Sequence, residues 1–149
     1  MQRDVGDPGV SLCILDASFT FQWLFEDEAT PEGDAALAAV RLAGAIVPQL
    51  WFVEIANGLG VAERRSRLTS AHVAEGMRLL RSLPLDVDEP PSLAWCEVVL
   101  ELMRAYRLTA YDATYLELAR RRGLSLATRD RDLLVAAPAA GVTLFAAPP

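Results

Sequence analysis

The sequence predicts an α/β domain, a three-layer sandwich in which about seven helices flank a mainly parallel, five-stranded central sheet. Short β-rich runs alternate with longer stretches of helical periodicity along the chain, which is typical of this class. Most of the runs are short and continuously apolar, as in strands that helices cover on both faces. At 149 residues and 52% hydrophobic, the chain fits one domain with a substantial core.

Strands are the better-marked elements. We predict five of them, at residues 11–15, 45–47, 85–87, 125–127 and 142–145. Polar or turn-forming residues bound each run. The order of strands and helices therefore indicates a sheet built by crossover connections.

Helices are predicted from their caps and apolar spacing. Thr30 followed by Pro31 starts one helix, and Thr109 and Gly123 bracket another. The full predicted set covers residues 17–25, 30–44, 51–65, 70–83, 92–106 and 109–123, with a short helix after Asp130.

The termini and cysteines bear on where the protein works. Residues 1–9 are expected to form a flexible tail before a single domain at 10–149, and they lack the basic and apolar runs of a signal peptide. No segment has the roughly 18 uninterrupted apolar residues of a membrane span. Cys13 and Cys96 are expected to be buried free thiols. We therefore expect a cytoplasmic protein without a membrane partner.

The net charge of −6 argues against a general binder of polyanions, which usually presents a basic face. This objection weakens if four of the acids bind cations, because the remaining surface is then closer to balance. The charge therefore counts against a nucleic-acid substrate but does not exclude one.

Four acids are the candidate catalytic and metal-binding residues. Asp16 and Asp130 follow predicted strands, so their carboxylates should emerge at carboxyl strand ends, where α/β sheets bind ligands. Glu54 and Asp112 fall in first turns of predicted helices. Each acid also has a simpler interpretation, as a helix cap, a dipole partner or, for Thr109-x-x-Asp112, a capping box.

If the first and fourth strands are adjacent and parallel, these four acids border one crevice. Like-charged carboxylates at close range destabilise the fold unless a cation neutralises them. Oxygen-only ligands suit Mg²⁺ or Mn²⁺, which activate water and stabilise charge on phosphate. The pattern predicts hydrolysis of phosphodiesters, with Asp132 as an alternative to Asp130.

Four pieces of the chain resemble the PIN-domain nucleases, and within them the VapC-type toxins of bacterial toxin–antitoxin pairs. They are Leu15-Asp16-Ala17-Ser18, Pro48-x-x-Trp51-x-x-Glu54-x-x-Asn57, Leu108-Thr109-Ala110-Tyr111-Asp112-Ala113 and Leu126-Ala127-Thr128-Arg129-Asp130. Each piece is weak alone, but four in this order are specific. The likeness extends from about residue 11 to residue 145.

The resemblance implies a metal-dependent endoribonuclease that cuts single-stranded or structured RNA, with Mg²⁺ or Mn²⁺ at Asp16, Glu54, Asp112 and Asp130. It further implies a homodimer and a small antitoxin protein that blocks the crevice. Ser18 and Thr128 are expected to support the carboxylates, and Asn57 to orient Glu54.

Two rival functions remain open. A non-catalytic module of the same fold could hold RNA or a protein. Less favoured is a phosphoryl-transfer enzyme with Asp16 as nucleophile, because position 18 is serine and not a second acid. His72 is the only histidine and is expected on a polar helix face, so neither a histidine triad nor a zinc site is supported.

Overall fold

The computed structural model describes residues 12–147 and contains one parallel sheet in the order β3-β2-β1-β4. Its strands are β1 (Cys13–Leu15), β2 (Ala45–Val47), β3 (Leu85–Val87) and β4 (Ser125–Ala127). In the register of the sheet, Ile14 lies opposite Ile46 on one side and Leu126 on the other. The predicted pairing of the first and fourth strands is confirmed.

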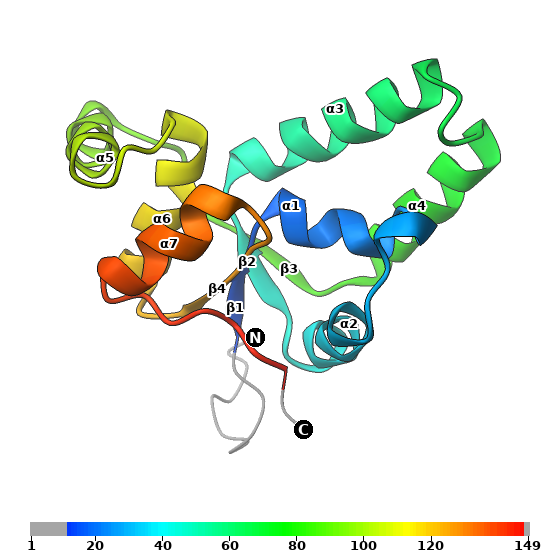
Figure 1. Cartoon of the computed structure of the whole chain (residues 1–149), viewed down its shortest axis with the longest axis horizontal. Helices are drawn as coiled ribbons and strands as arrows, with labels where there is room; N and C mark the ends of the chain where they lie inside the picture. The colour runs from blue at the N-terminus through cyan, green and yellow to red at the C-terminus, as the bar shows by residue number, and fades with distance from the viewer. Residues whose placement is uncertain (1–11, 148–149) are drawn as a thin grey trace.

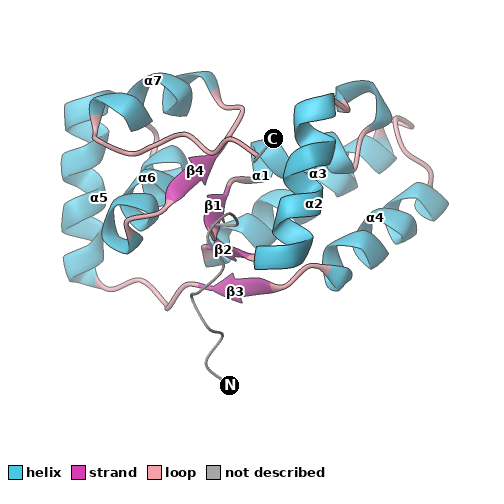
Figure 2. Ribbon diagram, turned by 90° about the horizontal axis from the view of Figure 1, so that it is seen from below, coloured by secondary structure: helices cyan, strands magenta, loops and turns pink. Residues whose placement is uncertain are grey.

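Helices cover both faces of this sheet (Figures 1 and 2). One face carries the elements that connect β1 to β3, namely α1 (Ala17–Thr20), the short 3₁₀ helices η1 (Phe21–Trp23) and η2 (Glu26–Glu28), α2 (Pro31–Ala43), α3 (Gln49–Arg64) and α4 (Ser70–Ser82). The other face carries α5 (Leu93–Tyr106), α6 (Ala110–Arg122) and α7 (Arg131–Ala139). The predicted three-layer architecture is confirmed.

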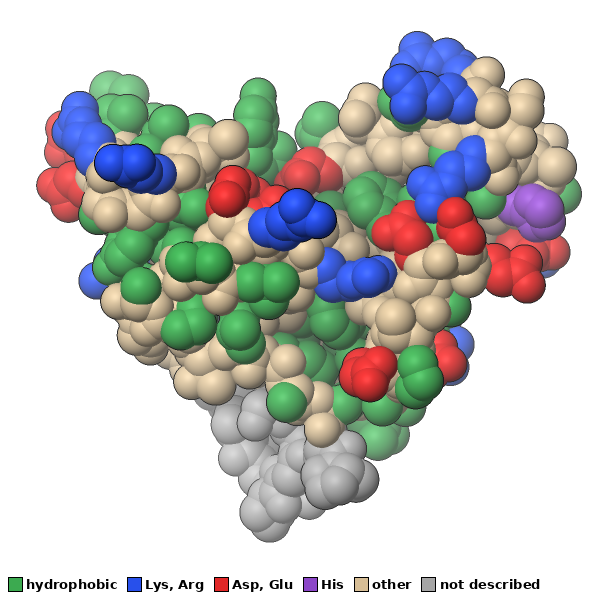
Figure 3. Space-filling model, in the orientation of Figure 1, with side chains coloured by type: hydrophobic (Ala, Val, Ile, Leu, Met, Phe, Trp, Pro, Cys, Tyr) green, Lys and Arg blue, Asp and Glu red, His purple; other side chains and the backbone are tan. Residues whose placement is uncertain are grey.

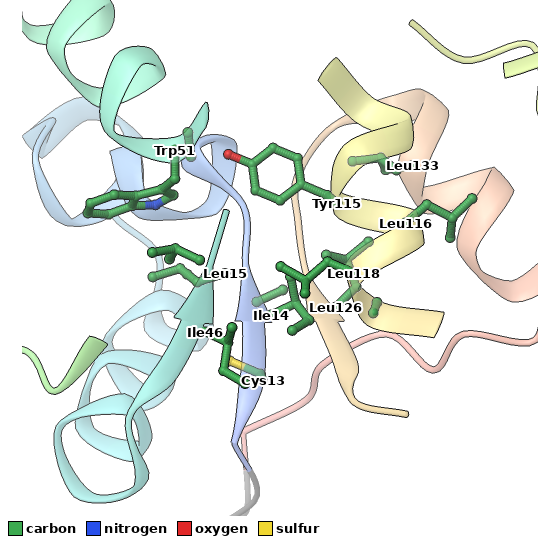
Figure 4. Packing of buried hydrophobic residues seen from close by; sticks show 14 of the residues in the cluster. Cys13, Ile14, Leu15, Ile46, Trp51, Tyr115, Leu116, Leu118, Leu126 and Leu133 are labelled. Carbon is green, nitrogen blue, oxygen red and sulfur yellow. The ribbon is translucent and has the colours of Figure 1, made fainter. Parts of the chain in front are cut away.

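The core joins the central strands to the helices on both sides (Figure 4). Ile14, Leu15 and Leu126 are fully buried, as apolar strands between two helical layers should be. On one side, the indole N–H of the buried Trp51 donates to Thr20 Oγ1 at 3.1 Å. A buried indole stabilises the fold only when its N–H has such a partner.

The strand order creates a crevice at one edge of the sheet. The chain leaves β1 through α1 on one face of the sheet, whereas it leaves β4 through α7 on the other face (Figure 1). The two connections therefore diverge at the carboxyl ends of β1 and β4, where Figure 3 shows a notch in the surface. Ligands of open α/β sheets bind at such a switch point.

Several predicted elements differ in detail. The sheet has four strands in the described part of the chain, because residues 142–145 contribute only a single parallel bridge between Leu126 and Leu144. The predicted helix 17–25 is divided into α1 and η1. Helix α3 begins at Gln49, which places Glu54 in its second turn and not its first.

Cys13 is buried as expected, but the prediction for Cys96 is wrong, since this residue lies on the exposed side of α5. The buried residues of this helix are Val99 and Leu102, and Cys96 lies in the turn before them, near the start of the helix. In residues 12–147, no helix has the length and apolar character needed to cross a membrane. The tail predicted at residues 1–9 lies outside the described residues.

Candidate functional site

Asp16 lies directly after β1, at the floor of the crevice. Its backbone N–H donates to Ala127 O at 3.0 Å, which ties it to the end of β4. Its side chain is only 3% exposed, and its Oδ2 accepts hydrogen bonds of 2.7 Å from the hydroxyls of Ser18 and Thr128. The side chain does not cap α1, so the simpler helix-cap interpretation of Asp16 does not apply.

Glu54 reaches the crevice from α3 and is held by a tyrosine of α6. The Tyr115 hydroxyl donates to Glu54 Oε1 at 2.7 Å across a separation of 61 residues. Figure 4 shows this hydroxyl pointing from α6 toward the start of α3. Burial raises the pKa of Tyr115, so its phenol stays protonated and remains a donor.

Asp112, Asp130 and Asp132 form the outer part of the cluster. One carboxylate oxygen of each lies within 4.8 Å of those of the other two. Thr109 Oγ1 accepts a bond from the Asp112 backbone N–H, but the reciprocal bond of a capping box is not formed. The Asp112 carboxylate is therefore left to face the other acids.

Asp130 has two roles, because it caps α7 and also belongs to this cluster. Its Oδ1 accepts from the backbone N–H groups of Asp132 and Leu133, both at 3.0 Å. Its own N–H donates to Thr128 Oγ1 at 3.0 Å. Thr128 therefore joins the environments of Asp16 and Asp130, and Asp132 remains an alternative ligand at the exposed rim.

Three of the candidate acids have raised pKa values, in part because the other acids lie nearby. Burial and the charges of Asp16, Asp112 and Asp130 raise the pKa of Glu54 to about 7, although the bond from Tyr115 opposes the shift. Burial and the charges of Asp130 and Asp16 raise the pKa of Asp112 to about 6. Burial is also the main cause of the raised pKa of Asp16. Like charges gathered in a low-dielectric crevice favour protonation in this way.

None of the four candidate acids forms an ion pair within residues 12–147. The arginines that do form ion pairs there, Arg67, Arg121, Arg122 and Arg129, bind Asp27, Glu28, Asp88 and Glu117. Figure 3 shows acidic side chains in the notch between the two halves of the molecule. Protonation, or a cation bound between them, neutralises carboxylates in this arrangement.

The structure brings together most of the residues singled out in the sequence. Ser18 and Thr128 hydrogen-bond Asp16, and Ser18 Oγ also accepts from the backbone N–H of Arg129 at 2.9 Å. Asn57, in contrast, is exposed on α3 and forms no hydrogen bond to Glu54 in the described structure.

Tyr115, and not Asn57 as predicted, is the residue that orients Glu54. Its position one turn after Asp112, on the same side of α6, is the sequence signal that could have identified it. A search of curated proteins found no match to this chain.

The crystal structure of PAE2754 from Pyrobaculum aerophilum is similar to this chain, with 26% sequence identity and a TM-score of 0.65 over 88% of this chain and 87% of that protein. The family model described as the PIN domain matches residues 13–138, which include β1, β4 and all the candidate acids. With this match over most of its length, the chain belongs to the PIN-domain family and has the fold of metal-dependent nucleases.

Proposed function

We propose that this protein is a metal-dependent endoribonuclease whose catalytic residues are Asp16, Glu54, Asp112 and Asp130. The observation that carries the proposal is the convergence of four acids from separate segments on one crevice, where none of them has an ion-pair partner among the described residues. Such an arrangement costs stability, since each carboxylate raises the pKa of its neighbours. A functional role for the cluster explains why this cost is retained.

The donor set suits a hard divalent ion, which we propose to be Mg²⁺ or Mn²⁺. All candidate ligands are carboxylate oxygens, and none of the described histidine or cysteine side chains joins them. Asp16, Glu54, Asp112 and Asp130 would hold the ion, with Asp132 able to replace Asp130. When bound, the ion supplies activation of water and stabilisation of charge on the phosphate.

The neighbouring side chains position the acids. Ser18 and Thr128 hold the Asp16 carboxylate from two sides, and Tyr115 holds Glu54 from α6. Because these donors come from different elements, the carboxylates are oriented before any ligand arrives. Such preorganisation commonly contributes a factor of about 10–100 in metal affinity or activity.

Cleavage of a single-stranded RNA by the wild type and by Asp16→Asn in the presence of Mg²⁺ tests the proposal. We expect the variant to lose cleavage, because the amide removes one anionic ligand and keeps the side-chain shape. Serine substitution of Cys96, an exposed residue of α5, is the matched control and should retain wild-type cleavage. Retained activity in Asp16→Asn would reject the assignment.

The rival functions give different results. A non-catalytic binding module would bind RNA equally well with or without Asp16 and would not cut it. A phosphoryl-transfer enzyme would form a covalent phosphoryl–Asp16 species, which mass spectrometry would detect. The enclosure of Asp16 by two hydroxyls, at 3% exposure, leaves little access for such an attack.

We further propose that the protein is a VapC-type toxin that forms a homodimer and is restrained by a small antitoxin. The acids without ion-pair partners in the described part of the chain support restraint by an antitoxin, since a basic side chain of that partner would neutralise them. Two exposed apolar side chains on α3, Phe52 and Val53, support the homodimer, because an interface between two copies would bury them. Measurement of mass in solution, and co-purification with the product of an adjacent small gene, test these two parts separately.

A further inference from the structure

A pocket of about 280 Å³ opens beside the acid cluster, and none of the acids of that cluster lines it. Its lining comes from the first turn of α3, from one side of α6, from the β3–α5 connection and from the start of α5. We name it the side pocket. The residues that matter for its chemistry are Leu50, Leu118, Trp95, Tyr111, Asp88 and Glu117.

The side pocket and the acid cluster share two helices. Tyr111 directly precedes Asp112 on α6. On α3, Leu50 precedes Glu54 by four residues, which is about 6 Å along a helix. An RNA strand with a phosphate at the acid cluster therefore passes close to the mouth of the side pocket. The two sites are about one helical turn apart along α3.

The walls of the pocket suit a flat, uncharged ring. Leu50 and the buried Leu118 supply apolar surface, and Trp95 and Tyr111 supply aromatic faces. Tyr111 is 63% exposed and lies at the mouth of the pocket, so most of its ring is accessible to a ligand. Proteins that bind single-stranded nucleic acid use such aromatic faces to stack bases.

The polar part of the pocket consists of two carboxylates fixed by a network. The Trp95 indole N–H donates to Glu117 Oε2 at 3.1 Å, and Arg121 Nε donates to Glu117 Oε1 at 2.7 Å. Arg121 also bridges to Asp88, whose pKa it holds below the ordinary range. Both carboxylates are less than 10% exposed, so the pocket is preformed.

We propose that the side pocket binds one nucleobase of the RNA substrate, next to the phosphate that is cut, and selects a base that presents amino or ring N–H donors. The proposal rests on the proposed ribonuclease function. Carboxylate oxygens only accept hydrogen bonds, so they favour the amino-bearing bases guanine, adenine and cytosine. Uracil carries a carbonyl on each side of its single ring N–H, so it presents fewer donors to these carboxylates. Arg121 and Arg122 neutralise the two acids, so the selection rests on hydrogen bonding and not on net charge.

Binding of abasic RNAs to a variant with a filled pocket tests this proposal. A tryptophan in place of Ala110, an exposed residue at the mouth, fills the pocket, whereas Ala71→Trp places the same side chain in the first turn of α4, away from it. Both changes are made in Asp16→Asn protein, which should not cut RNA. Fluorescence anisotropy then measures binding of short single-stranded RNAs, each lacking one base.

In the Ala71→Trp protein, loss of the base at one position should weaken binding by about tenfold or more, as expected for a stacked base. Replacement of that base by uracil should also weaken binding. In the Ala110→Trp protein the same losses should be less than about twofold. Equal losses in both proteins, or no sensitive position, would overturn the proposal.

A second measurement does not depend on cleavage or on the folding of Ala110→Trp. The indole N–H of Trp95 lies at the base of the network, so its NMR signal should shift when guanosine is added and shift less with uridine. Tyr111→Ala, which alters only the mouth, should reduce the guanosine shift.

The two proposals can fail separately. A guanosine-dependent shift in a protein that never cuts RNA would reject the ribonuclease function and keep the pocket. If the pocket is instead filled by a second copy of the chain, Ala110→Trp will lower the mass in solution, and the abasic RNAs will bind alike. That outcome would overturn the proposal.

Discussion

Replacement of Glu54 by glutamine should stabilise the metal-free protein, and only at neutral to alkaline pH. Folding raises the pKa of this carboxyl from an ordinary 4.5 to about 7. The folded state therefore binds a proton that the unfolded state has released, and stability falls as the pH rises from about 4.5 to about 7. Glutamine resembles the protonated acid and cannot lose that proton.

The magnitude follows from the size of the shift. A pKa that rises from 4.5 to about 7 corresponds to roughly 3 kcal/mol, since each tenfold change in proton affinity is worth about 1.4 kcal/mol. Glu54 is only half-buried, and solvent screening reduces this to on the order of 1–2 kcal/mol. For a domain of this size that is a rise of roughly 2–8 °C in Tm.

Urea unfolding with a chelator present, at pH 8 and at pH 4.5, measures the effect. The variant should exceed the wild type by about 1–2 kcal/mol at pH 8 and match it closely at pH 4.5. The Tyr115 hydroxyl can still donate to the amide oxygen, so packing is retained. Glu63→Gln, at an exposed position of the same helix, should change stability by less than about 0.5 kcal/mol at both pH values.

A variant that is less stable than the wild type at both pH values would refute the reasoning, because burial of the ionised carboxylate and repulsion by its neighbours would then not be the dominant effects. Mg²⁺ supplies a further check. It should raise the Tm of the wild type more than that of Glu54→Gln, since a ligand of the folded state stabilises in proportion to its affinity. Equal shifts would contradict a role for Glu54 in metal binding.

Three further variants test the supports of the site and the core. Tyr115→Phe removes the bond that lowers the pKa of Glu54, so the pH–rate profile of RNA cleavage should move to higher pH and the rate near neutrality should fall by about tenfold. Thr128→Val removes one of two donors to Asp16 and should weaken Mg²⁺ binding by about 10–100-fold in calorimetry, whereas unchanged affinity would show that the hydroxyl is dispensable. Leu116→Ala creates a cavity at a fully buried position and should cost about 2–5 kcal/mol in urea unfolding, while a cost below about 1 kcal/mol would contradict its place in the core.

The elements and the candidate acids could be read from local patterns because each depends on few neighbours. Thr30 accepts a bond from the Gly33 N–H at the start of α2, as its position before Pro31 predicts. Gly123 adopts a φ of 64° just after α6, the left-handed conformation that ends helices. Residues 142–145 have the apolar pattern of a strand, but they lie at the edge of the sheet and form only a single bridge there.

The supports of the site could not be predicted so well. Asn57 lies one turn after Glu54 on α3, so local spacing favoured it as a partner. The hydrogen bond comes instead from Tyr115, on a helix that packs against the other face of the sheet. Similarly, the Trp95–Glu117 contact that shapes the side pocket joins α5 to α6, and neither residue carries a local sign of it.

The sequence by itself determined the helical and extended periods, the caps, and the placement of acids directly after apolar strands, because these depend on interactions within a few residues. Only the tertiary structure decided that β1 lies beside β4, that Thr128 bonds Asp16 over a separation of 112 residues, and that carboxylates at several helix starts become neighbours. Strand order follows from how the two helical layers bury their apolar faces together, and that choice involves the whole chain at once.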